Sequence, residues 1–427
     1  MASVDGAIGF LEVGEGMKME SRTTTVNDVD MVDVVNQSYQ APSHQSGMER
    51  VLVTGASGYI ASHVVLQLLQ SGHKVKGTVR SLHNESKVKH LKNLCIDSTY
   101  PLELVEADLT NEQSWISAVK DCDAVLHLAS PFPTENPKDE SVLIIPAVEG
   151  TQNVLKACAL SSTVKRVVLT SSVASICDFS KDFEGDANES NWPDVDSLDP
   201  YSKSKMLAEK EAWNFMDKME TRGEKTFDLV VINPGFVLGP VLSGSSCTSM
   251  EVIKRLMCRD PPLIPKMNFS VVDVRDVASA HIAAMKLPEA NGRYITTAGN
   301  MSMKEMSAAL REEFKEQGYH PPGTGVPHFL FKLVALFDTG AKRIAPFRGK
   351  KIVFNNSKMK CDLKIEPHPL QQTVVDMAYS MIEGGFLKKT HQYKGKDVIN
   401  NKPTHEEEKD NEVTQQVTDD SYKQGDK

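Results

Sequence analysis

Short apolar runs rich in β-branched residues alternate with amphipathic stretches between residues 50 and 235. Such runs are typical of strands buried on both faces of a parallel sheet, and the stretches between them are typical of the helices that cover it. The alternation therefore predicts repeated strand–helix–strand units joined by right-handed crossovers. The predicted strands span residues 51–54, 74–80, 102–107, 124–129, 166–171 and 229–233.

This alternation ends near Pro234. The stretches TSMEVIKRLM, MSMKEMSAALREEF and DVRDVASAHIAAMKL predict helices, the last capped by Asp273 or Asp276, and KKIVFNNSKMK predicts a strand that leads into another helix. We therefore expect one α/β domain over residues 48–388. Its two parts are a Rossmann-type doubly wound parallel sheet, mostly residues 50–235, and a smaller C-terminal substrate-binding cap, mostly residues 236–388.

The two ends of the chain lack this periodicity. Residues 1–47 are polar, and residues 389–427 are charged and nearly devoid of apolar side chains. Both compositions predict disorder, because they offer too little apolar surface to bury. No run of about 18 apolar residues is present, which predicts no membrane span. The N-terminus also lacks the basic lead-in and the apolar core of a signal peptide.

Charge and cysteine content narrow the class of protein further. The 427 residues carry a formal net charge of −9, which disfavours a nucleic-acid partner. The seven cysteines are an odd number, and none belongs to a Cys-x-x-Cys pair. Scattered cysteines in so long a chain predict reduced thiols in the cytoplasm, with neither a disulfide framework nor a metal site.

A glycine-rich turn follows the first predicted strand and opens an apolar helix, in the stretch VLVTGASGYIASHVV. Its spacing is Gly-x-x-Gly-x-x-Ala, which suits a tight turn, close approach of backbone N–H groups to a pyrophosphate, and close packing of helix on strand at Ala61. A plain strand–helix turn would also use such glycines. The position at the head of several strand–helix units favours a dinucleotide site instead. Its predicted contacts are Gly55, Ser57, Gly58, Tyr59 and Ile60.

The end of the second predicted strand indicates which dinucleotide is bound. An NAD site places an acidic residue here to hold the ribose hydroxyls, whereas this chain has Arg80, followed by Lys87. Two cations suit the 2′-phosphate of NADP(H). A solvated loop would explain Arg80 equally well if the glycine turn were absent.

Two further strand ends add candidate cofactor contacts. After the third strand, Asp108 is placed to accept from the adenine amino group and Leu109 to cover the ring. After the fourth, Ala129 and Ser130 are small enough for a cofactor to cross the strand ends, where ligands of open α/β sheets bind.

The stretch DPYSKSKMLAEKEAW carries the candidate chemistry. Asp199 and Pro200 predict a helix that begins there, so that Tyr201 and Lys205 share one face while Lys203 points elsewhere. A tyrosine ordinarily titrates at about pH 10, and a nearby ammonium stabilises its phenolate. Such a pair suits proton transfer to an alkoxide. An isolated Tyr-x-x-x-Lys would more often be an ordinary solvated helix.

Two adjacent serines are candidates for the group that polarises a substrate carbonyl. Ser171 and Ser172 end the fifth predicted strand, and a hydroxyl there can donate to a substrate carbonyl. We favour Ser172, because Ser171 is equally well explained as a polar residue that ends a strand. His127 lies within an apolar strand and is predicted to be a buried histidine with its hydrogen bonds satisfied.

Taken together, these motifs resemble the extended short-chain dehydrogenase/reductases, and more narrowly the dihydroflavonol reductase-like and aldehyde (methylglyoxal) reductase-like group. The resemblance covers about residues 50 to 388 and also includes HLASPF, EGTQNVLKAC, INPGFVLGP and VVDVRDVASAHIAAM. It implies an NADP-dependent carbonyl reductase, reversibly an alcohol dehydrogenase, with Ser172, Tyr201 and Lys205 as catalytic triad. It also implies cofactor contacts at Pro234, Val237 and Ser249.

The chain departs from the group at one informative position. Some flavonoid-acting members carry a polar amide or acid five residues after the catalytic serine, and this chain has Cys177 there. The resemblance therefore argues against a polyphenol substrate. It implies a small carbonyl compound as partner and a monomer or weak homodimer.

Two other functions remain open. An NAD-dependent 3β-hydroxysteroid dehydrogenase or sugar epimerase shares the triad, but Arg80 argues against an NAD enzyme. A protein that senses NADPH without turnover needs none of Ser172, Tyr201 and Lys205, so the intact triad favours an enzyme.

Overall fold

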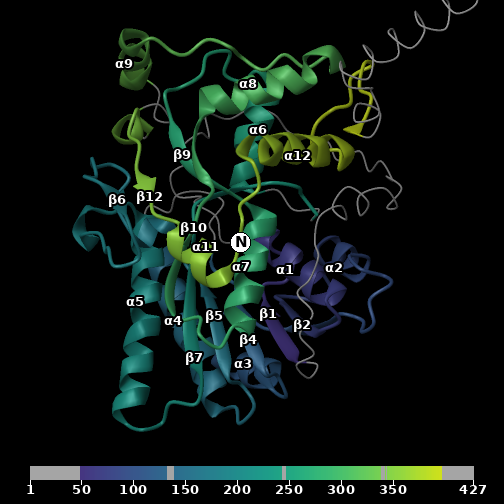
Figure 1. Ribbon diagram of the computed structural model, residues 1–427, viewed down its shortest axis with the longest axis vertical. Helices are drawn as coiled ribbons and strands as arrows, with labels where there is room; N and C mark the ends of the chain where they lie inside the picture. Colours follow the sequence, from purple (N-terminus) through teal and green to yellow (C-terminus); the bar gives the residue numbers. More distant parts are fainter. Residues whose placement is uncertain (1–48, 132–138, 243–246, 338–341, 343, 397–427) are drawn as a thin grey trace, which may run out of the picture.

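The computed structural model describes residues 49–131, 139–242, 247–337, 342 and 344–396 (Figure 1). The sequence predicts disorder for residues 1–47 and 397–427, and these residues lie outside the described ranges. No described helix is both long and apolar enough to cross a bilayer. No group of three or more His, Cys, Asp or Glu side chains in the described ranges is arranged to hold a metal ion.

A seven-stranded sheet forms the centre of the molecule (Figure 1). Its strand order is β10-β7-β5-β4-β1-β2-β3, and every neighbouring pair is parallel. This confirms the doubly wound Rossmann-type fold. The strands are β1 (Arg50–Thr54), β2 (Lys74–Val79), β3 (Glu103–Glu106), β4 (Ala124–His127), β5 (Arg166–Thr170), β7 (Asp228–Pro234) and β10 (Gly292–Thr296).

Helices cover both faces of this sheet. The apolar side chains of α1, α2 and α7 join one core cluster with Val51, Val53 and Leu126, whereas those of α3, α4 and α5 pack on the opposite face with Leu52, Val125 and other residues. Alternate residues of one strand thus enter two cores, as the β pleat requires. The helices are α1 (Tyr59–Gln70), α2 (Glu85–Lys92), α3 (Glu112–Val119), α4 (Ser141–Leu160), α5 (Pro200–Thr221) and α7 (Val274–Lys286).

Two elements beyond Pro234 belong to the sheet layer rather than to the cap. Strand β10 pairs with β7 over Gly292–Thr296, and helix α7 packs against α1. The sheet layer therefore extends past residue 235, up to which the sequence places most of it, and includes these two segments. Strand β10 carries the charged Arg293 directly after Gly292, so its sequence GRYIT does not stand out as an apolar run.

The expected cap lies beyond the C-terminal edge of the sheet (Figure 1). It holds a three-stranded sheet in the order β11-β9-β8 and a two-stranded pair of β12 and β6. Predicted helices 248–257 and 301–314 are present as α6 and α8. The cap elements are β6 (Asp186–Ala187), β8 (Phe236–Leu238), α6 (Thr248–Cys258), β9 (Asn268–Asp273), β11 (Gly299–Ser302), α8 (Met303–Phe314), α9 (His328–Phe337), β12 (Val353–Phe354) and α12 (Leu370–Glu383). Helix α11 (Ser357–Leu363) instead packs on β10 and α7.

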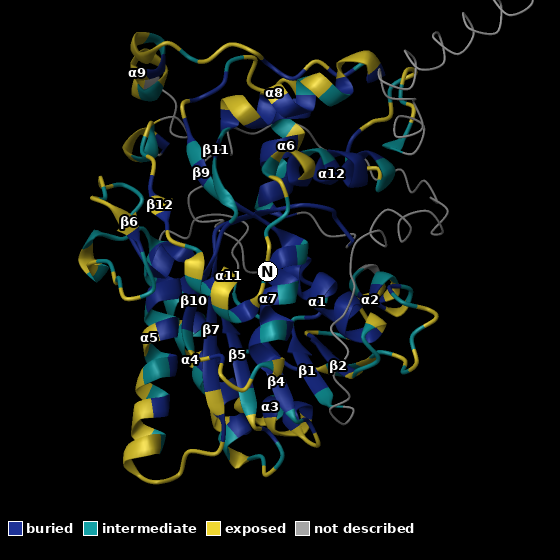
Figure 2. Ribbon diagram, viewed as in Figure 1, coloured by how far each residue is buried: buried dark blue, intermediate teal, exposed yellow. Residues whose placement is uncertain are grey.

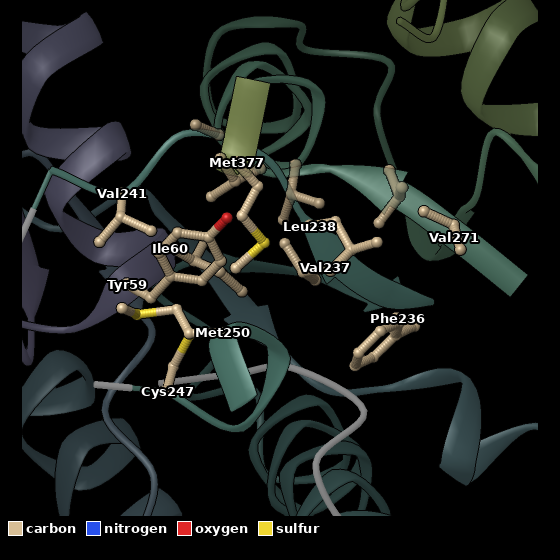
Figure 3. Packing of buried hydrophobic residues seen from close by; sticks show 14 of the residues in the cluster. Tyr59, Ile60, Phe236, Val237, Leu238, Val241, Cys247, Met250, Val271 and Met377 are labelled. Carbon is tan, nitrogen blue, oxygen red and sulfur yellow. The ribbon is translucent and has the colours of Figure 1, made fainter. Parts of the chain in front are cut away.

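One apolar core continues from the sheet into the cap. Figure 3 shows Tyr59 and Ile60 of α1 beside Val237 and Leu238 of β8 and Met377 of α12. Figure 2 shows the corresponding dark band of buried residues running from the sheet into α6 and α12. The cap is thereby fixed against the helix that follows the glycine turn.

A buried ion network reinforces the same junction. Asp273, one of the two expected caps, begins α7 by accepting from Arg275 N, and its other oxygen pairs with the Arg275 guanidinium at 2.7 Å. The guanidinium also contacts Asp376 of α12 at 2.9 Å, and Asp376 accepts from Lys396 at 2.7 Å. The folded part therefore continues to residue 396, beyond the expected boundary at residue 388.

Candidate active site

The glycine turn has the geometry expected of a pyrophosphate site. Gly55 has φ of +65°, and a Cβ there would lie 3.1 Å from Ala129 Cα, so a larger residue would be both strained and crowded. Gly58 is the N-cap of α1, and no side chain caps that helix. The first-turn N–H groups and the positive end of the helix dipole therefore face a position that suits a phosphate.

Tyr59 and Ile60 reach this position only through their backbone. Both side chains are buried in the core, and the Tyr59 hydroxyl donates to Gly239 O at 2.7 Å. Figure 3 shows the Tyr59 ring within the apolar cluster beside Met250. Ser57 lies half-buried in the turn itself. Tyr59 thus ties the dinucleotide turn to the cap.

Thr54 fixes the end of the neighbouring strand β4, and the sequence did not identify it. Its hydroxyl oxygen accepts from Leu128 N at 3.0 Å and from Ala129 N at 2.9 Å, so its own proton is donated to His127 Nδ1 at 2.9 Å. Burial lowers the pKa of His127 to about 3. His127 is therefore the neutral, satisfied histidine that the sequence predicted.

The two residues expected to bind a 2′-phosphate lie in the segment that follows strand β2. Arg80 is exposed directly after β2, and Lys87 is half-buried on α2, which begins shortly afterwards. Asp108 follows β3, where Thr110 donates its N–H and its hydroxyl to one carboxylate oxygen at 2.8 Å and 2.6 Å. These bonds, and to a smaller extent the charge of Arg80, lower the pKa of Asp108.

Leu109 is held by two residues of α4 that the sequence did not identify. Asn153 Nδ2 donates to Leu109 O at 2.8 Å. A Cβ at Gly150 would lie 2.8 Å from Leu109 Cβ, so only glycine allows this approach. A glycine within the predicted helical stretch EGTQNVLKAC was the available signal, because such a residue usually has a packing reason.

Helix α5 begins as predicted. Asp199 Oδ1 accepts from Tyr201 N at 3.1 Å and from Ser202 N at 3.2 Å, and Pro200 is the first helical residue. Tyr201 and Lys205 are each 5 % exposed on the inner face. Lys203 instead faces outward, where it pairs with Glu140 at 2.8 Å.

Tyr201 and Lys205 of α5 and the turn that begins at Ser172 lie at the C-terminal edge of the sheet. Lys205 Nζ donates to Ser130 Oγ at 3.1 Å, which joins α5 to the residues after β4. Tyr201 packs in a small apolar cluster with Ala174, two residues after Ser172. The two candidate hydroxyl groups thus belong to elements in direct contact, since α5 packs on the short 3-10 helix η4 (Val173–Ser175).

The two serines have different partners. Ser171 Oγ donates to the buried carboxylate of Glu209 at 2.5 Å. Ser172 begins η4, and its Oγ accepts from Ala174 N at 3.1 Å, which leaves the hydroxyl proton to be donated. These partners favour Ser172 over Ser171 as the group that polarises a carbonyl.

The remaining expected cofactor contacts lie after β7 and on α6. Pro234 ends β7, and Val237 lies buried in β8. Ser249, in the first turn of α6, is fully buried, and its Oγ has no hydrogen-bond partner among the described residues. A buried hydroxyl without a partner is costly, which suits a ligand that supplies one.

A cavity of about 40 Å³ borders the turn that begins at Ser172. Phe179 lines it and also packs against the Tyr201 cluster. Cys177 lies buried nearby in sequence, and burial raises the pKa of its thiol. The lining residues are Val173, Phe179, Phe236, Met267, Asn268, Phe269, Ser270, Asn300, Phe347, Lys350, Ile352 and Phe354.

The fold and this site define a dinucleotide-dependent oxidoreductase of the Rossmann type. Residues 51–296 match the NAD dependent epimerase/dehydratase family, and the chain belongs to this family. Its members include the extended short-chain dehydrogenase/reductases, so the resemblance seen in the sequence is confirmed.

Known proteins extend this assignment. Cinnamoyl-CoA reductase 1 of Arabidopsis thaliana is 36% identical over 342 residues, which cover 79% of this chain and 90% of that protein. Tetraketide alpha-pyrone reductase 1 of the same plant is 34% identical over 347 residues, or 79% of this chain and 97% of that protein. The crystal structure of yeast methylglyoxal/isovaleraldehyde reductase Gre2 complexed with NADPH has a TM-score of 0.65 and 30% identity, and covers 79% of this chain and 99% of its own.

These findings confirm an NADP-dependent oxidoreductase. The open first turn of α1, the cation at Arg80 and the buried hydroxyl of Ser249 are features of this chain that fit NADP(H).

Proposed function

We propose that this protein reduces an aldehyde or ketone with NADPH, reversibly, and that Tyr201 is its general acid and base. One observation carries the proposal: Tyr201 and Lys205 are buried on one face of α5, beside the turn that begins at Ser172. Bound NADPH supplies the hydride. The protein supplies the proton, the groups that polarise the carbonyl and a site that excludes water.

Each group of the triad has a distinct role in this proposal. Ser172 donates its hydroxyl proton to the carbonyl oxygen, as an oxyanion donor does. Tyr201 transfers its phenolic proton to the same oxygen as the alcohol forms, and Lys205 stabilises the phenolate that remains. The hydrogen bond from Lys205 to Ser130 supports this role, because it holds the ammonium at the edge of the sheet.

The side chains that line the cavity beside Ser172 are mostly apolar, which favours an apolar carbonyl compound as substrate. Five of its lining residues are phenylalanines, whose large apolar rings favour an apolar ligand. Ser270 is another lining residue, and its buried Oγ has no partner among the described residues, so it suits one polar substituent. Cys177 supplies no strong hydrogen bond for a phenolic hydroxyl, which argues against polyphenols.

NADPH consumption with a panel of aliphatic and aromatic aldehydes and ketones tests the proposal. We expect turnover by the wild type, and for Tyr201→Phe a kcat lower by about 10²-fold or more with unchanged NADPH binding. Tyr319→Phe is the matched control, because this buried tyrosine lies in the cap and donates to Lys388 O. Wild-type protein that binds NADPH and reduces no carbonyl, or a fully active Tyr201→Phe, would contradict the proposal.

The proposal also includes the compartment and the oligomeric state of the enzyme. All seven cysteines are free thiols, which suits a reducing compartment such as the cytoplasm. We propose a monomer or weak homodimer, and light scattering coupled to size-exclusion chromatography measures this directly.

A further inference from the structure

Helix α5 carries a third buried functional group in line with its catalytic pair. Tyr201, Lys205 and Glu209 follow one another at intervals of four residues, so they share the inner face of the helix. Glu209 is 1 % exposed, although it carries a carboxylate. A carboxylate is rarely buried so fully unless it is paired and hydrogen-bonded. The proposed reaction assigns it no role.

The Glu209 carboxylate is joined to both strand ends that form the site. Its Oε2 accepts from Ser171 Oγ at 2.5 Å and from Asn233 Nδ2 at 2.9 Å. Ser171 immediately precedes Ser172, and Asn233 immediately precedes Pro234. The same Asn233 amide donates to Ser172 O at 3.2 Å. One carboxylate on the helix of Tyr201 therefore binds the side chain that precedes the candidate polarising serine and the amide that binds the carbonyl of that serine.

A guanidinium completes the arrangement from the edge strand. Arg293 of β10 donates Nε to Glu209 Oε1 at 2.6 Å and is 7 % exposed. Its other nitrogens donate to Ser175 O at 2.9 Å, at the end of η4, and to Glu189 O at 2.9 Å. The guanidinium lies 3.8 Å above the ring of Trp192. Arg293 thus holds the far end of the turn that Ser172 begins.

We propose that Glu209 is a positioning residue. Together with Arg293, it holds the Ser172 hydroxyl at the position and orientation in which it acts on the same carbonyl as Tyr201 and Lys205. Glu209 touches neither substrate nor cofactor. It acts by holding the turn from Ser171 to Ser175 against α5. The inference rests on the proposed function, in which Ser172 polarises the carbonyl.

A role in stability alone accounts poorly for these contacts. A buried ion pair is weak evidence for stability, because the cost of removing two charges from water offsets their attraction. What such a pair fixes is geometry, and a small displacement of a catalytic group can cost on the order of 100-fold in rate. The partners of Glu209 also lie next to the reacting residues rather than scattered through the core.

A double-mutant cycle between Glu209→Gln and Ser172→Ala tests the inference. Single-turnover reduction is measured on the four full-length proteins, normalised to the NADPH-binding fraction. Ser172→Ala alone should lower the rate about 100-fold. Glu209→Gln should lower it on the order of tenfold in the wild-type background, with NADPH affinity unchanged, and by less than twofold in the Ser172→Ala background.

The possible results of this cycle distinguish a failure of the role proposed for Ser172 from a failure of the positioning role proposed for Glu209. A full-rate Ser172→Ala variant would overturn the polarising role that the proposed function gives Ser172, and this inference with it, whereas the role of Tyr201 is tested separately by Tyr201→Phe. If Ser172→Ala is slow but Glu209→Gln costs the same factor in both backgrounds, only the positioning role fails. Should Glu209→Gln not fold, Ser171→Ala takes its place in the cycle, because it removes the link to the turn and keeps the ion pair.

Asp376→Asn is the matched control for loss of a buried charge. Asp376 is also 1 % exposed and paired with an arginine, Arg275, but it lies on α12 of the cap. Asp376→Asn should lower the melting temperature and leave the single-turnover rate of the folded fraction within twofold of the wild-type rate. A comparable rate loss in this control would mean that any buried charge deletion slows the enzyme, which overturns the specific role of Glu209.

Discussion

Lys205 Nζ donates to Ser130 Oγ at 3.1 Å, across the boundary between helix α5 and the segment that follows β4. The two residues are 75 positions apart in the sequence. Their contact fixes a buried ammonium at the C-terminal edge of the sheet, where ligands of this fold bind. Lys205 is thereby oriented by the sheet as well as by its own helix.

Replacement of this ammonium should slow the reaction. We expect Lys205→Met to lower kcat about 100-fold, because the phenolate of Tyr201 loses its nearby cation. Lys203→Met is the control, since Lys203 lies on the same turn but pairs outward with Glu140. Steady-state kinetics with saturating NADPH compare the two variants. Equal activity of both would show that Lys205 has no part in the chemistry.

The choice of cofactor should depend on Arg80. Arg80→Glu places a carboxylate where a 2′-phosphate would bind, so we expect the KM for NADPH to rise by about 10- to 100-fold while the KM for NADH changes little. Lys92→Glu, an exposed charge reversal at the end of α2, is the control. The ratio of kcat/KM for the two cofactors measures the effect. An unchanged ratio in Arg80→Glu would remove this residue from the cofactor site.

Six strands of the sheet and helix α5 were predictable from sequence because their signals are local. Each of the six predicted strands was recognised as a short apolar run, and Asp199 and Pro200 fix the register of α5 within a few residues. Strand β10 has no such signal. It joins the sheet because β7 offers an unpaired edge, and the sequence of β10 alone does not reveal that partner.

From the sequence, the site was predictable only where the spacing of residues within one element determines it. The sequence places Tyr201 and Lys205 together by helical spacing, but it does not show that Tyr59 turns into the core toward Gly239. Nor does it reveal Glu209, whose partners Ser171 and Asn233 come from two other strands. Such contacts depend on how distant elements pack, which periodicity does not encode.

Buried neutral histidines should make the protein sensitive to acid. Burial lowers the pKa of His63 and His281 to about 4 and that of His127 to about 3, against an ordinary value of 6.5. Below pH 6.5 the unfolded chain therefore binds protons that the folded chain does not. The free energy of unfolding should fall as the pH drops from 6.5 toward 4, by up to about 1.4 kcal/mol per pH unit for each ring.

His281→Gln isolates one of these contributions. The His281 ring donates Nδ1–H to Val277 O at 2.7 Å and accepts from Thr170 Oγ1 at 2.6 Å, so the variant should be less stable at pH 7. Its stability difference between pH 7 and pH 5 should nevertheless be smaller than that of the wild type. Urea unfolding at both pH values measures this, with the exposed His320→Gln as control. An undiminished difference in His281→Gln would contradict the assignment.

Gly235→Ala should destabilise the junction between sheet and cap. A Cβ at Gly235 would lie 2.3 Å from Ser270 O of β9 and 2.9 Å from Thr297 Cγ2, and the first of these is backbone that cannot rotate away. Strand β8 must then move, at a cost of about 3 kcal/mol, and it carries the adjacent Pro234 with it. Gly325→Ala is the control, because its nearest neighbour would be Ile264 O at 3.7 Å. We expect a lower urea midpoint and weaker NADPH binding in Gly235→Ala alone. Matching midpoints and affinities in the two variants would mean that the chain does not approach so closely at Gly235.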